Sequence, residues 1–102
     1  MILTSKILNK LTNLILVNRY DLLEKIKTKV VYSEEYEDYE IWIYFILNEP
    51  ITQRELFQSD FHPFNVIDND LINLLKSIGV KKRQITQIYV TVINSDNKVI
   101  YG

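Results

Sequence analysis

Residues 41–47 read Ile-Trp-Ile-Tyr-Phe-Ile-Leu, an uncharged run of β-branched, aromatic and aliphatic residues. This composition favours a β-strand. Because successive side chains on a strand point to opposite faces, the four odd-numbered residues share one face and are predicted to form core. Trp42 and Tyr44 share the other face. The stretch therefore predicts a strand with one buried side and one aromatic side.

A second uncharged strand is predicted for residues 85–93. Its even-numbered aliphatic residues are predicted core, whereas Tyr89 and Thr91 lie on the opposite side. Residues 94–97 are rich in Asn, Ser and Asp, which predicts a turn. A short final strand follows at residues 98–101.

Helical periodicity dominates the N-terminal part of the chain. Residues 7–15 are predicted to form a helix that Thr4 or Ser5 caps. Asp21 is predicted to cap a second helix over residues 22–30. Three basic residues lie towards its C-terminal end, where positive charge suits the helix dipole; they are Lys25, Lys27 and Lys29.

Similar signals recur in the second half. Residues 52–55 read Thr-Gln-Arg-Glu, the pattern of a capping box, and predict a short helix. Residues 61–64 contain a proline and are predicted to form a loop. Asp68 or Asp70 is predicted to cap the next helix, and Gly79 to end it in a left-handed conformation.

Three blocks of the first half find counterparts in the second, at offsets of 48, 49 and 47 residues. They begin at Leu3, Asp21 and Ile41, and they match blocks at Ile51, Asp70 and Ile88. The chain holds fifteen isoleucines, so coincidence is the alternative. The matches predict a single α+β domain, residues 1–102, made of two degenerate helix-helix-strand repeats, residues 1–49 and 50–102. A pseudo-two-fold axis would relate the repeats around a small antiparallel sheet with helices on one face, and a groove would lie at the seam.

Composition excludes several classes of protein. The 102 residues carry a net charge of −1, no Cys, one His and two Gly. Disulfides, thiolate metal sites and glycine-rich phosphate loops are therefore excluded. No catalytic constellation is visible, so we expect a non-enzymatic protein without a cofactor. No apolar run reaches membrane-spanning length and no targeting signal is visible, which predicts a soluble, cytoplasmic protein.

The aromatic side of the two strands is the candidate binding site, since Trp and Tyr are enriched at binding hot spots. Its residues are Trp42, Tyr44, Tyr89 and Thr91. We expect an extended peptide of a partner protein to lie there, with hydrogen bonds from a strand edge. Burial of this side by loops or by a homodimer mate is the alternative, and in the second case the protein would be a homo-oligomeric structural component with the aromatic side as its subunit interface.

Two charged runs lie in corresponding linkers. Residues 34–40 hold five acids, after a short strand predicted at residues 30–32. A basic patch of Lys76, Lys81, Lys82 and Arg83 lies in the second half, and it predicts a nucleic-acid-binding protein as an alternative function. The net charge makes nucleic acid and membrane unexpected partners. Solvated loops are the other interpretation of both runs.

The whole chain has a strong compositional bias, with no Ala, nine Asn and seven Tyr, and local stretches such as Tyr39-Glu40-Ile41-Trp42-Ile43-Tyr44. In size and bias it resembles the small orphan proteins of filamentous and rod-shaped viruses of thermoacidophilic archaea, of the Acidianus filamentous virus type. The resemblance implies a virus-encoded protein in the host cytoplasm. It implies no functional residues.

Overall fold

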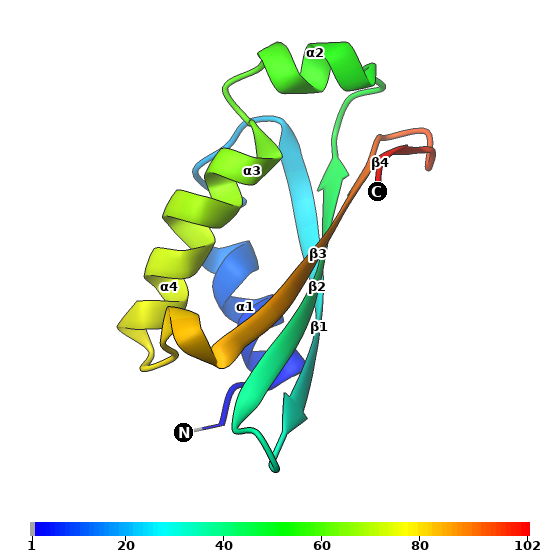
Figure 1. The fold of residues 1–102 in the computed structure, drawn as a ribbon. Coiled ribbons are helices and arrows are strands. Elements are labelled where there is room, and N and C mark those ends of the chain that lie inside the picture. The colour runs from blue at the N-terminus through cyan, green and yellow to red at the C-terminus, as the bar shows by residue number, and fades with distance from the viewer. Residues whose placement is uncertain (1) are drawn as a thin grey trace.

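A computed structural model describes residues 2–102 as a four-stranded sheet with helices packed on one side (Figure 1). The elements in chain order are α1 (Ser5–Ile15), β1 (Leu23–Ser33), β2 (Asp38–Leu47), α2 (Gln53–Gln58), α3 (Pro63–Asn65), the π-helical segment η1 (Val66–Leu71), α4 (Ile72–Ser77), the 3-10 turn η2 (Lys82–Gln84), β3 (Ile85–Ile93) and β4 (Val99–Tyr101). The strands lie side by side in the order β1-β2-β3-β4. Within residues 2–102, no helix has the length and apolar character that crossing a membrane requires.

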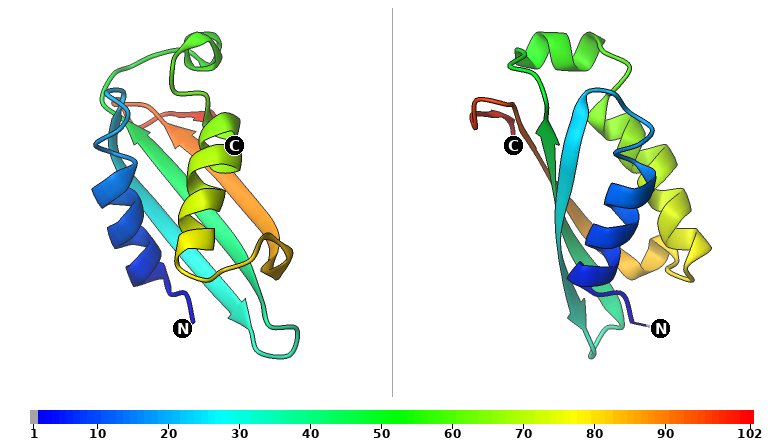
Figure 2. Two further views of the ribbon diagram at one scale, coloured as in Figure 1. Left: turned by 90° about the vertical axis from the view of Figure 1, so that its left-hand side faces the viewer. Right: turned by 180° about the vertical axis from the view of Figure 1, so that it is seen from behind.

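The predicted two-sided character of β2 is confirmed. Ile41, Ile43, Phe45 and Leu47 are each 0% exposed and belong to one buried cluster with residues of the helical segments. Helix α1 and the α3–α4 segment cover the same face of the sheet (Figure 2). The even-numbered residues between them are only half-buried. Alternation along β2 thus separates the core of the protein from an open face, as period two requires.

The expected antiparallel sheet is wrong, because β2 and β3 run parallel and the sheet is mixed. The helical segment between these two strands supplies the crossover that parallel neighbours need. The hairpins β1–β2 and β3–β4 are antiparallel. A two-fold axis normal to the sheet would make β2 and β3 antiparallel, so the relation predicted between residues 1–49 and 50–102 is not confirmed.

The predicted helix over residues 22–30 is also wrong, because this segment is the first part of β1. Its pairing with β2 runs from Leu23 opposite Leu47 to Ser33 opposite Asp38. Residues 30–32, predicted as a short separate strand, form the last part of β1, and the chain then turns through the acidic stretch to β2. Pairing with an apolar neighbour strand outweighs a local helical pattern.

The helix-terminal signals have mixed outcomes. Thr4 caps α1, the capping box of α2 forms between Thr52 and Glu55, and Gly79 is left-handed with φ +91°. The predicted caps at Asp68 and Asp70 are wrong, because α3, η1 and α4 follow one another without a break. The expected loop at 61–64 ends two residues early, since Pro63 occupies the first helical turn, which tolerates proline.

Side chains of α1 close the outer edge of β1. Ser5 Oγ accepts a hydrogen bond from Val30 N–H at 2.7 Å, and Asn9 Oδ1 accepts one from Thr28 N–H at 2.8 Å. Asn13 does the same for Ile26, accepting from its N–H at 2.9 Å and donating to its carbonyl. Helix α1 lies along β1 in both views of Figure 2.

The spacing of these three contacts follows from helix and strand geometry. Four residues of helix rise about 6.0 Å, and two residues of strand rise about 6.7 Å. Polar residues four apart on α1 therefore meet backbone groups two apart on β1. The outward N–H groups of Ile26, Thr28 and Val30, which would otherwise be unpaired on this edge, are thus satisfied within the chain.

Replacing Asn9 by alanine leaves the Thr28 N–H without its acceptor. We expect the free energy of unfolding to fall by about 1–3 kcal/mol, measured by urea denaturation. Asn18→Ala is the matched control, since Asn18 lies in the turn after α1 and its exposed amide donates to Leu14 O. Equal stability of the two variants would contradict a stabilising role for this ladder.

Candidate functional site

The open face of the sheet gathers all four residues predicted for peptide binding. Trp42 lies opposite Tyr89, and Tyr44 lies opposite Thr91, in the parallel pairing of β2 with β3. The helices cover the other face (Figure 1). The sequence therefore predicted their common face correctly, although it missed the direction of the strands that carry them; their role in peptide binding stays a prediction.

Trp42 is held in a stack that runs across three strands. Its ring and that of Tyr89 are 4.7 Å apart and within 21° of parallel. On β1, Lys29 is the register partner of Trp42, and its Nζ lies 5.2 Å from the indole centroid. Both faces of the indole are therefore occupied. Tyr89 remains 42% exposed, and its second ring face points away from β2, towards the outer side of β3.

This stack fills the position where a groove is expected from the duplication. The hollow of the open face lies on the other side of Tyr44, with a volume of about 560 Å³. Its lining residues are Glu24, Lys25, Lys27, Thr28, Tyr44, Ile46, Ile93 and Asn97. Its floor is thus aromatic and aliphatic, and its β1 wall is basic.

Sequence reasoning missed the basic wall because it placed the lysines on a helix. On β1, Lys25, Lys27 and Lys29 alternate with inward-facing residues, and they pair with Ile46, Tyr44 and Trp42 respectively. All three lysines therefore lie on the open face. Their spacing of two, followed by Val-Val-Tyr at 30–32, is the sequence signal that indicates a strand.

The predicted basic patch is divided between separate hollows. Lys81 and Arg83 line one of about 440 Å³ together with Glu37 and Asp38 of the β1–β2 turn. Lys82 lines another, of about 220 Å³, next to β3. The acidic and basic linkers thus meet at the same end of the molecule, and the carboxylates lower the local attraction for phosphate.

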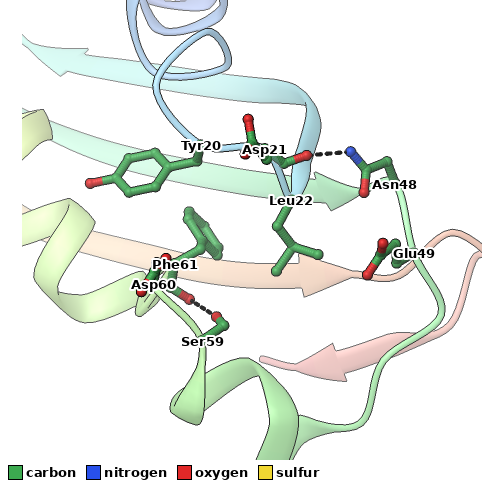
Figure 3. A pocket seen from close by; sticks show the side chains of 8 residues that line it. All are labelled: Tyr20, Asp21, Leu22, Asn48, Glu49, Ser59, Asp60 and Phe61. Carbon is green, nitrogen blue, oxygen red and sulfur yellow. Dashed lines mark hydrogen bonds between the residues drawn. The ribbon is translucent and has the colours of Figure 1, made fainter.

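A fourth hollow, of about 280 Å³, lies where the loop after α1 meets the segments that follow β2 and α2 (Figure 3). Its rim carries Asp21, Glu49 and Asp60. Tyr20, also in the lining, donates a hydrogen bond from its hydroxyl group to the Asp70 carboxylate. Arg19 forms an ion pair with the same carboxylate at 2.8 Å. Burial, this hydrogen bond and the charge of Asp70 raise the pKa of Tyr20 to about 12.

The described part of the chain shows no further cluster of His, Asp and Glu side chains that resembles a catalytic or metal site. The sole imidazole, His62, packs against Phe57 and Phe64 with centroids 5.0 and 6.0 Å apart, and its buried Nδ1 has no hydrogen-bond partner. Residues 2–102 contain no group of three or more His, Asp or Glu arranged to hold a metal ion.

The two edges of the sheet differ. The β1 edge is closed by α1, whereas β4 pairs with β3 only at Val92 and Ile93. Residues 85–90 of β3 have no strand beside them on that side in the described chain (Figure 2). The hollow of about 220 Å³ that Lys82 lines runs along this free edge, with Ile67 and Ile72 on the helix side.

No protein-family model, curated protein or solved structure matches the chain, so the viral resemblance stays a prediction.

Removing the Tyr89 ring uncovers one face of the only tryptophan in the chain. We expect Tyr89→Ala to shift the emission of Trp42 to longer wavelength and to increase its quenching by acrylamide. The lost aromatic pair should also cost about 0.5–1.5 kcal/mol of stability. Tyr36→Ala, in the exposed turn, is the control. Unchanged Trp42 emission in Tyr89→Ala would show that the stack does not exist in solution.

The raised pKa of Tyr20 predicts a loss of stability at alkaline pH. Between pH 10 and about 12 the unfolded chain loses the phenol proton, whereas the folded protein keeps it. The free energy of unfolding therefore falls as pH rises through this window. Tyr20→Phe should show a shallower fall than Tyr36→Phe, measured by urea denaturation across the window. Identical slopes would argue against the shifted pKa.

Proposed function

We propose that this protein is a protein–protein interaction module, which binds an extended peptide of a partner as an added strand on the free edge of β3. The contrast between the two sheet edges is the observation that carries the proposal. Edge strands are normally protected by charges, proline or a covering element. The β1 edge has both lysines and a covering helix, but residues 84–95 contain no charge and no proline.

The backbone of β3 supports strand addition at two residues. Asn94 N–H donates to Lys98 O, so the even-numbered residues of β3 direct their backbone groups towards β4. A Cβ built on Gly102 would lie 2.5 Å from Val90 O, so Gly102 lies against this carbonyl on the side of β4. By alternation, Ile88 presents both its N–H and its C=O to the free side, and Val90 presents its N–H, where a peptide backbone can pair with them.

Side chains on both faces of the edge suggest the pattern of the peptide. On the helix side, Ile67, Ile72 and Ile88 line the hollow and would accept an apolar side chain. On the open side, the free ring face of Tyr89 would stack an aromatic side chain or an Arg. A peptide that alternates between these two classes fits the edge, and this recognition requires no duplication of the chain.

The proposal is tested by selecting peptides from a phage-displayed random library on the immobilised protein. One selected peptide is then synthesised with a single N-methyl group at each backbone position in turn. We expect binding to be lost at every second position, because only alternate N–H groups of an added strand face β3. Insensitivity to methylation, or loss without this period, would rule out strand addition, as would failure to select any peptide.

A variant tests the same contact from the protein side. Ile88→Pro removes an N–H on the free side and leaves the ladder with β2, a position where edge strands tolerate proline. With folding checked by circular dichroism, we expect peptide affinity to fall at least roughly tenfold, whereas Ile88→Val retains it. Unchanged affinity contradicts the proposal. A dimer in sedimentation analysis that Ile88→Pro dissociates would assign the edge to a second copy and overturn it.

A further inference from the structure

We propose that the open face of the sheet is a second binding site, for a short segment of single-stranded nucleic acid. The site is separate from the free edge of β3 and does not depend on the function proposed above. The phosphates would lie along Lys25, Lys27 and Lys29, and a base would occupy the hollow beside Tyr44.

The charge of the lysine column is available to a ligand. Within residues 2–102 the ion pairs are Arg19 with Asp70 and Lys98 with Asp96, and neither uses a lysine of β1. Residues two apart on a strand are about 6.7 Å apart, which is comparable to the distance between successive phosphates of an extended single strand. The column thus presents a repeating positive charge to a ligand with a repeating negative one.

The hollow next to the column matches a base. Tyr44 has no aromatic partner in the described chain, unlike Trp42 and Tyr89, so its ring is free to stack. Ile46 and Ile93 complete an apolar floor. Glu24 is the one carboxylate in the lining, and it can accept a hydrogen bond from an exocyclic amino group. Stacking platforms beside basic grooves are typical of single-strand binding proteins.

An acidic peptide is the competing ligand, because its alternate carboxylates would also match the lysine spacing. Such a peptide would leave the aromatic and aliphatic hollow empty. A nucleic acid places a planar ring beside each charge, and so it accounts for both the column and the hollow. Duplex DNA is disfavoured because its bases are stacked inside the helix and cannot reach Tyr44.

The charge distribution limits the length of the site. The five acids of residues 34–40 surround the β1–β2 turn at the opposite end of the face, so the nucleic acid is confined to the three lysine rows. This corresponds to roughly four nucleotides, the short end of known single-strand sites. Three phosphate contacts predict that log K falls with log salt with a slope of about −2.

The test is a titration with single-stranded DNA of about 12 nucleotides. Binding is measured as quenching of the fluorescence of Trp42, which is the only tryptophan in the sequence and a neighbour of the site. We expect Lys27→Gln to weaken binding and to reduce the salt slope by about 0.7. Lys82→Gln, in η2, removes the same charge elsewhere and should change neither quantity. Tyr44→Ala should weaken binding roughly tenfold with little change in slope.

Four results would overturn the proposal. They are no binding at low salt, binding that Lys27→Gln and Tyr44→Ala leave intact, equal loss in Lys82→Gln, and tighter binding of duplex DNA or of a polyglutamate peptide. Ile88→Pro should bind the oligonucleotide normally. A variant that loses the selected peptide but keeps the oligonucleotide therefore separates this site from the β3 edge.

Discussion

The alternation of buried and half-buried residues along β2 is the constraint on which the rest of the structure depends. Its odd-numbered residues are fully enclosed under α1 and the α3–α4 segment. Every residue paired with β2 inherits one of the two faces, because a cross-strand partner points to the same side. The lysines of β1 and Tyr89 of β3 therefore reach the open face through their register with the even-numbered residues of β2.

The two edges of the sheet differ in whether their outward backbone groups have hydrogen-bond partners. Along β1, polar residues at helical spacing on α1 meet backbone groups at strand spacing, so this edge is closed from within the chain. Along β3, the short β4 covers one end only. An uncharged, uncovered edge in a small protein is an aggregation hazard unless a strand is meant to pair with it. This asymmetry is the basis of the proposal that β3 pairs with a partner strand.

The net charge of −1 is the sum of positive and negative charges that lie at different places on the molecule. One end of the open face carries the lysine column, and the other carries the acidic β1–β2 turn, which lies close to Lys81 and Arg83. Lys81 and Arg83, which the sequence suggested as a basic patch, thus lie near carboxylates. The β1 lysines lie beside aromatic rings and form no ion pair in the described chain. Local placement, not overall composition, decides which cations can meet a ligand.

The sequence by itself determined the features that depend on near neighbours: the two faces of β2 and β3, a cap of α1 at Thr4 or Ser5, the capping box at Thr52, and the left-handed Gly79. These signals are local, because period two and capping geometry involve residues a few positions apart. Only the tertiary structure decided that residues 23–29 are strand and not helix, that β2 and β3 run parallel, and that one edge stays open. Each of these depends on which distant segment pairs with the chain, and that pairing energy exceeds the small local preferences that a single sequence displays.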